Sequence, residues 1–178
     1  MPNNNSVNQI IQNLKESNKK YISENKDKLA KFVDGQNPKI AVLTCSDSRV
    51  VPEFIFDKSI GDIFVVRVAG NVTMDASVLS SLEYAVEHLK VDLLIILGHT
   101  NCGAIIAAEK STDTSNELLN EIRKCFPLHE NHFLSNIMYQ LDLLPKRSKI
   151  ISNAIEEGTL SITGALYNLK NGSVEFLQ

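Results

Sequence analysis

Hydrophobic side chains near the start of the chain recur with the period of a helix. The first set follows i, i+3, i+4 and i+7 spacing, which places its members on one helical face: Val7, Ile10, Ile11 and Leu14. The spacing resumes after a polar stretch. It predicts one or two amphipathic helices over residues 7–33, in an N-terminal helical arm of residues 1–35.

Three short apolar runs follow, at residues 39–45, 63–69 and 92–97. They are rich in β-branched residues, as buried parallel strands are. Residues 75–90 lie between the second and third runs and have the pattern of a helix capped by Asp75. Strands that alternate with helices predict an α/β fold, a single domain with a central, mostly parallel sheet flanked by helices on both faces.

The rest of the chain predicts short helices at residues 117–126, 132–144 and 148–157. Two further strands, 160–166 and 174–177, flank the Asn171-Gly172 turn. We therefore expect residues 36–178 to form the catalytic domain, with about four parallel strands and a C-terminal edge strand or hairpin.

Composition excludes several classes of protein. The chain has 178 residues, of which 43% are hydrophobic and 22% charged, with a net charge of −3. These values are globular, and the negative charge argues against a nucleic-acid partner. No apolar run is long enough to cross a membrane. The first residues lack the pattern of a secretory signal, so we expect a cytoplasmic protein, with its three cysteines reduced.

The chemistry is concentrated after two of the predicted strands. Cys45 ends the first strand, while His99 and Cys102 follow the third. Ligands in such sheets bind beyond the carboxyl ends of the strands. Two thiolates and one imidazole suit Zn²⁺, and three protein ligands leave a fourth position open, as catalytic sites require. The two thiolates cancel the charge of the ion, so we expect the pKa of a metal-bound water to be lowered less than in a three-histidine site.

Asp47 and Arg49 follow Cys45 at alternate positions. A carboxylate and a guanidinium at this spacing can form a charge-assisted pair. Such a pair would keep Asp47 ionised and let it accept a hydrogen bond from metal-bound water. At this stage two alternatives remain open. One is a structural zinc module in which Asp47 or a further side chain closes the fourth position, and the other is a redox or acyl-transfer enzyme with Cys45 or Cys102 as nucleophile.

The two motifs, Cys45-x-Asp47-x-Arg49 and His99-x-x-Cys102, resemble those of the β-class carbonic anhydrases. The stretches around Phe64-Val65-Val66-Arg67, Ala69-Gly70-Asn71 and Ser81-Leu82-Glu83-Tyr84 agree with this resemblance, which is dense over residues 36–103. The resemblance implies reversible hydration of CO₂ to bicarbonate and a proton by zinc-bound hydroxide, oriented by the Asp47–Arg49 dyad.

The same resemblance implies a pocket for the substrate. Gln36, Phe64 and Tyr84 stand at positions that line the CO₂ pocket in the family, and the backbone N–H of Gly103 would face bound substrate. The family also implies a homodimer or higher homo-oligomer, with the pocket at the subunit boundary and the first helix reaching across. Relatives with the same ligands hydrolyse carbon disulfide or carbonyl sulfide, so the ligands alone leave the substrate open.

Overall fold

The computed structural model describes residues 4–177. Residues 1–3, part of the segment that was inspected for a secretory signal, and residue 178 lie outside the described residues. The chain divides into two units, Met1–Gln36 and Asn37–Gln178. None of the described helices is both long and apolar enough to cross a membrane.

The first unit contains one continuous helix, α1 (Asn4–Ala30), of 27 residues. It confirms the helical interpretation of this segment up to Ala30, after which the chain forms a turn. Its apolar positions are exposed, with Ile10 at 58% and Leu14 at 64% of their full accessibility. We call the set Val7, Ile10, Ile11 and Leu14 the apolar stripe of α1.

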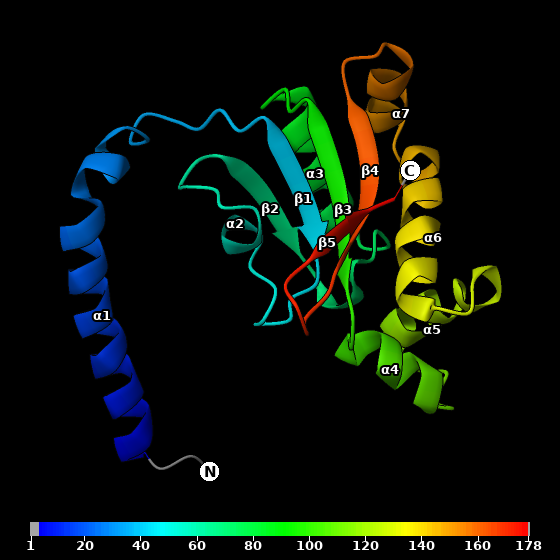
Figure 1. The fold of residues 1–178 in the computed structure, drawn as a ribbon, viewed down its shortest axis with the longest axis horizontal. Coiled ribbons are helices and arrows are strands. Elements are labelled where there is room, and N and C mark those ends of the chain that lie inside the picture. The colour runs from blue at the N-terminus through cyan, green and yellow to red at the C-terminus, as the bar shows by residue number, and fades with distance from the viewer. Residues whose placement is uncertain (1–3, 178) are drawn as a thin grey trace. The chain divides into compact units, whose positions relative to one another are not determined.

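The second unit is built on a five-stranded sheet with the order β2-β1-β3-β4-β5, in which four strands lie side by side (Figure 1). The strands are β1 (Ile40–Thr44), β2 (Ile63–Arg67), β3 (Leu93–His99), β4 (Ser161–Tyr167) and β5 (Val174–Phe176). The first four are parallel, and β5 runs antiparallel to β4. The predicted fold class and the C-terminal edge strand are confirmed.

Among the described residues of this unit, six helices accompany the sheet. They are α2 (Pro52–Ile55), α3 (Ala76–Glu87), α4 (Gly103–Lys110), α5 (Glu117–Arg123), α6 (His132–Arg147) and α7 (Lys149–Glu156), with 3₁₀ turns at Ala69–Asn71 and Phe126–Leu128. The predicted cap of α3 is confirmed, since the Asp75 side chain accepts a hydrogen bond from Ser77 N at 2.8 Å.

The end of α6 differs from the prediction of a helix that stops at residue 144. The helix continues through Pro145 to Arg147. Its last turn is held by tertiary contacts, because the Arg147 guanidinium donates to Thr73 Oγ1 at 3.0 Å and to Glu121 Oε1 at 2.6 Å. The short α2 and the turn at Ala69–Asn71 were also not predicted, because segments of three or four residues have no periodicity to detect.

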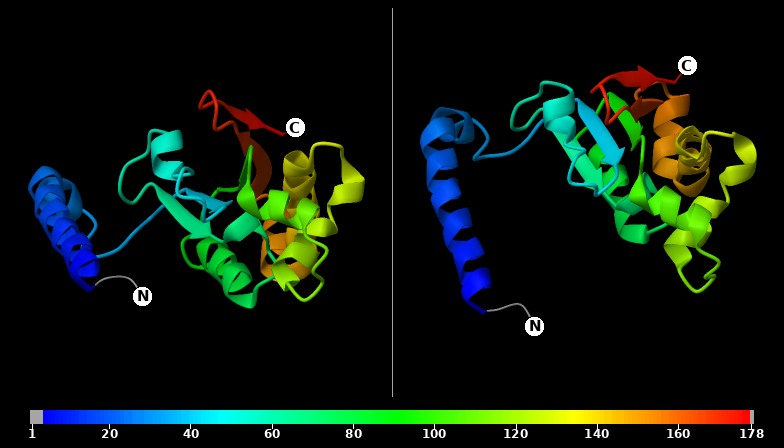
Figure 2. Two further views of the ribbon diagram at one scale, coloured as in Figure 1. Left: turned by 90° about the horizontal axis from the view of Figure 1, so that it is seen from below. Right: turned by 60° about the horizontal axis from the view of Figure 1, so that its bottom comes forward.

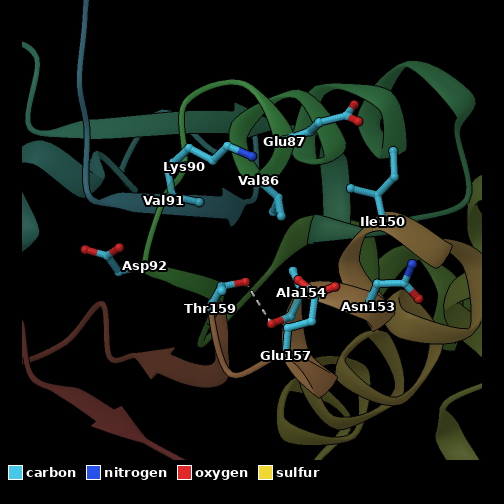
Figure 3. Close-up of a pocket in the computed structure, with 10 residues that line it drawn as sticks. All are labelled: Val86, Glu87, Lys90, Val91, Asp92, Ile150, Asn153, Ala154, Glu157 and Thr159. Atoms are coloured by element: carbon cyan, nitrogen blue, oxygen red, sulfur yellow. Dashed lines mark hydrogen bonds between the residues drawn. The ribbon is translucent and has the colours of Figure 1, made fainter.

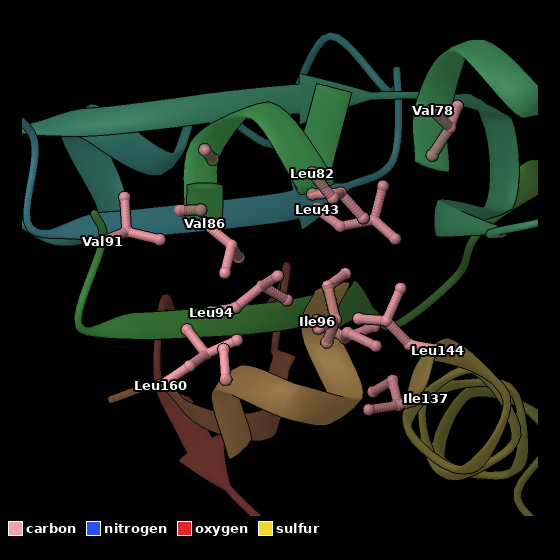
Figure 4. Packing of buried hydrophobic residues seen from close by; sticks show 14 of the residues in the cluster. Leu43, Val78, Leu82, Val86, Val91, Leu94, Ile96, Ile137, Leu144 and Leu160 are labelled. Atoms are coloured by element: carbon pink, nitrogen blue, oxygen red, sulfur yellow. The ribbon is translucent and has the colours of Figure 1, made fainter. Parts of the chain in front are cut away.

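The helices cover the two faces of the sheet unequally. Leu43, Leu94 and Ile96 point to the face covered by α3, α6 and α7, where the largest buried cluster forms (Figure 4). Val42 and Ile95 point to the other face, which is covered by α2 and by residues around β5. Figure 2 shows α3 and α7 on one side of the parallel strands and α2 on the other. The core therefore supports the sheet on which the candidate site stands.

Close packing of α6 on the sheet generates a stability prediction. A Cβ atom at Gly164 of β4 would lie 2.6 Å from Ile137 Cγ2 and 2.8 Å from Leu141 Cδ1. We expect Gly164→Ala to lower the free energy of unfolding by about 1–3 kcal/mol, because the core must move to accept the methyl group. Urea denaturation measures this. The exposed Ser161→Ala on the same strand is the control, and equal stabilities of the two variants would contradict the prediction.

Candidate metal centre

The parallel register of β1 and β3 brings two distant segments together. Thr44, the last residue of β1, pairs with Leu97 of β3. Cys45 therefore emerges beside His99, which ends β3, and Cys102 follows in the turn before α4. One ligand atom from each of these three residues lies within 4.8 Å of the other two. The structure thus gathers the three predicted ligands into one buried cluster.

The donor atoms fit a tetrahedral Zn²⁺ ion. The two Sγ atoms are 3.9 Å apart, close to the separation of about 3.8 Å expected for two sulfurs bound 2.3 Å from one zinc. The His99 Nδ1 atom lies 2.9 Å from the Thr100 carbonyl oxygen. If Nδ1 donates its proton there, the lone pair is on Nε2. Nε2 is buried and has no hydrogen-bond partner among the described residues, as expected of an atom whose lone pair coordinates a metal.

The two thiols are electrostatically inequivalent. The contact with Cys102 is the main cause that lowers the pKa of Cys45 below its ordinary value, and the Gly70 N–H acts in the same direction. The same contact, together with burial, raises the pKa of Cys102. Two anionic sulfurs at this distance repel each other, and a divalent cation between them removes that repulsion.

Asp47 lies next to the cluster and is held by Arg49. The Arg49 guanidinium donates from Nε to Oδ1 at 2.9 Å and from Nη2 to Oδ2 at 2.7 Å, and the Arg49 backbone N also donates to Oδ1 at 2.9 Å. These hydrogen bonds from Arg49 hold the pKa of Asp47 well below its usual range. Asp47 Oδ2 is 3.9 Å from His99 Nε2, so an ionised carboxylate borders the cluster.

Two groups that the sequence analysis did not select hold the loop after β1. Arg67 donates from Nη2 to the Asp47 carbonyl at 2.7 Å and from Nε to the Cys45 carbonyl at 3.3 Å. Gly70 N donates to Cys45 Sγ at 3.3 Å. Both residues stand in stretches that carry the family resemblance, Phe64-Val65-Val66-Arg67 and Ala69-Gly70-Asn71, and the available signal was their place in those stretches.

The other predicted residues occupy different places. Gly103 begins α4 beside Cys102, and a Cβ built on it would meet nothing within 4 Å, so it borders open space. Phe64 and Tyr84 contact each other, with ring centroids 6.2 Å apart. Phe64 pairs with Ala41, about 13 Å of strand before Cys45. Gln36 belongs to the first unit. The Phe64–Tyr84 pair is therefore separate from the metal cluster of its own chain.

The remaining histidines and the third cysteine lie outside the cluster. His88 is exposed beside Tyr84, with ring centroids 5.1 Å apart. His132 lies 2.7 Å from Glu109 Oε1 and stacks on Phe126. Cys125 is fully buried, and burial raises its pKa to about 11, so it is a packing residue.

A cavity of about 460 Å³ lies between α3 and α7 (Figure 3). Asp92 and Thr159, which precede β3 and β4, contribute to its lining. It therefore lies at the amino ends of the strands, at the opposite edge of the sheet from the metal cluster. The Thr159 hydroxyl donates to the Ala154 carbonyl at 3.1 Å, and no cluster of metal-ligating side chains was found there among the described residues.

The fold and the cluster define an α/β protein with a Cys₂His metal-binding group at the carboxyl edge of its parallel sheet. Residues 40–174 match the family model described as carbonic anhydrase. Carbonic anhydrase 2 of Mycobacterium tuberculosis is 35% identical over 97% of this chain and 93% of its own length. Carbonic anhydrase of Mycolicibacterium smegmatis is 34% identical over 98% and 95%.

Solved structures agree with these sequence relatives. The β-carbonic anhydrase CcaA superposes with a TM-score of 0.83 at 25% identity, covering 97% of this chain and 95% of that one. The Coccomyxa β-carbonic anhydrase, solved with acetazolamide, has a TM-score of 0.79 at 26% identity over 95% and 85%. The chain belongs to the β-class carbonic anhydrase family. Its enzyme class is carbonate dehydratase, which interconverts CO₂ and bicarbonate.

The contact between Asp47 and Arg49 generates a pH prediction. Because the folded protein lowers the pKa of Asp47, the ion pair stabilises the fold above the ordinary aspartate pKa of about 4, and this contribution is lost as the pH falls through the lower folded value. We expect Arg49→Ala to raise the pKa of Asp47 toward the ordinary value, as measured by carbon-13 NMR titration of the carboxyl group. Lys39→Ala, which removes a distant exposed cation, is the control, and an unchanged Asp47 titration in Arg49→Ala would contradict the prediction.

Proposed function

We propose that the chain hydrates CO₂ at a Zn²⁺ ion held by Cys45, His99 and Cys102. The unpartnered, buried Nε2 atom of His99, together with two Sγ atoms 3.9 Å apart, carries this proposal. Zn²⁺ bound there would lower the pKa of a coordinated water, so that water serves as the nucleophile near neutral pH. Three protein ligands would leave one coordination position for that water.

Asp47 orients the nucleophile in this proposal. Its Oδ2 atom borders the cluster, and an ionised carboxylate can only accept hydrogen bonds. Arg49 keeps the carboxylate ionised and occupies both of its oxygens, which favours the orienting role over a role as fourth metal ligand. The Arg67 guanidinium donates to the backbone carbonyls of Cys45 and Asp47 and so holds the loop that joins these two residues. With Zn²⁺ bound, the dyad would orient the nucleophile toward the carbon of CO₂, and the proton lost by the water would pass to solvent or buffer.

Gly103 contributes to substrate binding through its backbone N–H. It begins α4, so its N–H is one of the groups left without a partner inside the helix. The open space beside it leaves room for an oxygen of bicarbonate. A hydrogen bond from this N–H would stabilise the negative charge that develops on the substrate oxygen.

Gln36, Phe64 and Tyr84 are proposed to line the CO₂ pocket across a subunit boundary. Phe64 lies about 13 Å of strand away from Cys45 of its own chain, so this pair cannot cover the metal cluster from within the same sheet. A second copy of the chain would have to supply these side chains. The exposed apolar stripe of α1 supports association, because a helix with such a face is stabilised by burying it.

Substitution of Asp47 distinguishes a catalytic zinc site from a structural zinc module and from an enzyme with a thiol nucleophile. We expect Asp47→Asn to lower stopped-flow CO₂ hydration by about 100-fold or more while zinc content stays unchanged, because an amide is a weaker acceptor than a carboxylate. Asp142→Asn, which neutralises an exposed carboxylate on α6, is the control.

A metal-replete wild-type protein without turnover would favour the structural module. A metal-free protein that stays active until iodoacetamide alkylates it would favour the thiol enzyme. The rate of carbonyl sulfide hydrolysis, measured beside the rate of CO₂ hydration, tests which of the two is the substrate.

A further prediction concerns assembly. Deletion of residues 1–33 should lower both the oligomeric state and the solubility, because it removes the apolar stripe of α1. A point variant on the stripe, Leu14→Glu, should also lower the oligomeric state, whereas Lys15→Glu on the adjacent polar face should leave the oligomeric state unchanged. Sedimentation velocity measures the result, and an unchanged, active dimer after the deletion would refute the prediction.

A further inference from the structure

A series of hydrogen bonds connects the candidate ligand Cys45 to two buried side chains of α6. Gly70 N donates to Cys45 Sγ at 3.3 Å. The Gly70 carbonyl in turn accepts from Asn136 Nδ2 at 2.8 Å, and Asn136 Oδ1 accepts from Gln140 Nε2 at 3.4 Å. Asn136 and Gln140 are both fully buried. Two neutral amides are thus placed behind the metal cluster with their hydrogen bonds directed toward it.

The far end of this series determines which way the amides face. Gln140 Oε1 accepts from both the backbone N and the Oγ1 of Thr73, at 2.9 and 2.8 Å. Gln140 must therefore present its Nε2 group to Asn136, and Asn136 must present its Nδ2 group to Gly70. Thr73 Oγ1 also accepts from Arg147, which is paired with the buried Glu121 at 2.6 Å. The orientation of each amide is thereby specified by its neighbours rather than by packing alone.

Gly70 needs such an anchor. Its φ is +70°, in the left-handed region, and a Cβ atom there would lie 2.8 Å from Ile122 Cδ1. Glycine therefore fits this position, yet it is also the residue with the widest backbone freedom. The hydrogen bond from Asn136 to the Gly70 carbonyl restricts that freedom, and with it the direction of the Gly70 N–H.

The Gly70 N–H acts directly on the sulfur. A hydrogen bond to a thiolate draws electron density from it and weakens its donation to a bound metal, which is one way in which proteins tune metal centres. The effect matters here because two thiolates neutralise the charge of Zn²⁺ and reduce its acidifying power. A fixed N–H···S contact restores part of that power and also stabilises the ionised sulfur.

We propose that Asn136, oriented by Gln140, is a positioning residue of the metal centre: it anchors Gly70 so that the Gly70 N–H sets how strongly Cys45 donates to the metal. This inference rests on the proposed function, since it requires Cys45 to be a ligand. It differs from a purely structural role, in which Asn136 only satisfies buried polar groups and its loss would affect stability alone.

The neighbouring residue on α6 provides a matched control. Ser135 is also fully buried, and its Oγ donates to a backbone carbonyl, that of Cys125, at 2.5 Å. Ser135→Ala therefore also removes one buried hydrogen bond between a side chain of α6 and a backbone carbonyl. This hydrogen bond is not part of the series that reaches Cys45. Any general loss of folding stability that follows from removing such a hydrogen bond should appear in both variants.

The experiment compares the full-length wild type, Asn136→Ala and Ser135→Ala. Zinc affinity is measured by competition with a chelator, and the sulfur-to-metal charge-transfer band is recorded after substitution with Co²⁺. We expect Asn136→Ala to bind zinc about 10-fold or more weakly, because Gly70 and the Cys45 sulfur beside it are no longer anchored. We also expect its band to move to lower energy, because a thiolate without its hydrogen bond donates more readily. Ser135→Ala should lower the melting temperature without either change.

Three results would overturn the inference. Asn136→Ala could keep the wild-type affinity and band, or Ser135→Ala could shift both by the same amount. A wild-type chain that takes up neither Zn²⁺ nor Co²⁺ would overturn the proposed function itself, which is distinguishable because the failure then precedes any substitution. If Asn136→Ala does not fold, Gln140→Met gives the same test. It keeps the volume of the side chain and removes the group that orients Asn136.

Discussion

The parallel pairing of β1 with β3 is the constraint on which the candidate site depends. Cys45 and His99 are far apart in the chain, and only the register Thr44↔Leu97 brings the two strand ends to the same level. A change of register by one residue would turn Cys45 to the opposite face of the sheet. The buried side chains Leu43, Leu94 and Ile96 fill the interior beneath α3 and α6, so the hydrophobic core maintains this register.

The site joins groups whose burial has a free-energy cost. Two thiols, an unpartnered imidazole nitrogen and a carboxylate lie within a few ångströms of one another, and each would be poorly solvated without a partner. Arg49 compensates for Asp47, and the Gly70 N–H compensates in part for Cys45. Within residues 4–177, His99 Nε2 has no hydrogen-bond partner. A bound cation would satisfy it and both sulfurs at once, which couples metal binding to the stability of the surrounding loops.

The sequence was most informative where one feature repeats or where chemistry is local. Alternation of apolar runs with helical periods predicted the parallel sheet, and the motif spacing selected Cys45, His99 and Cys102, which the structure gathers. It was least informative about α2 and the turn at Ala69–Asn71, because these depend on contacts rather than periodicity. Asn136 and Gln140 were missed, although two amides four residues apart on the buried face of a predicted helix were a usable signal.

By itself the sequence determined the fold class, the set of candidate metal-ligating side chains and the Asp47–Arg49 pair, because these follow from hydrophobic period and from short motifs after the predicted strands. Only the tertiary structure decided that His99 Nε2 is left without a partner and that Phe64 lies far along the sheet from Cys45. The tertiary structure also decided that hydrogen bonds from α6 reach the Gly70 N–H. These features depend on distances between elements remote in sequence, which packing and strand register set and which no local pattern encodes.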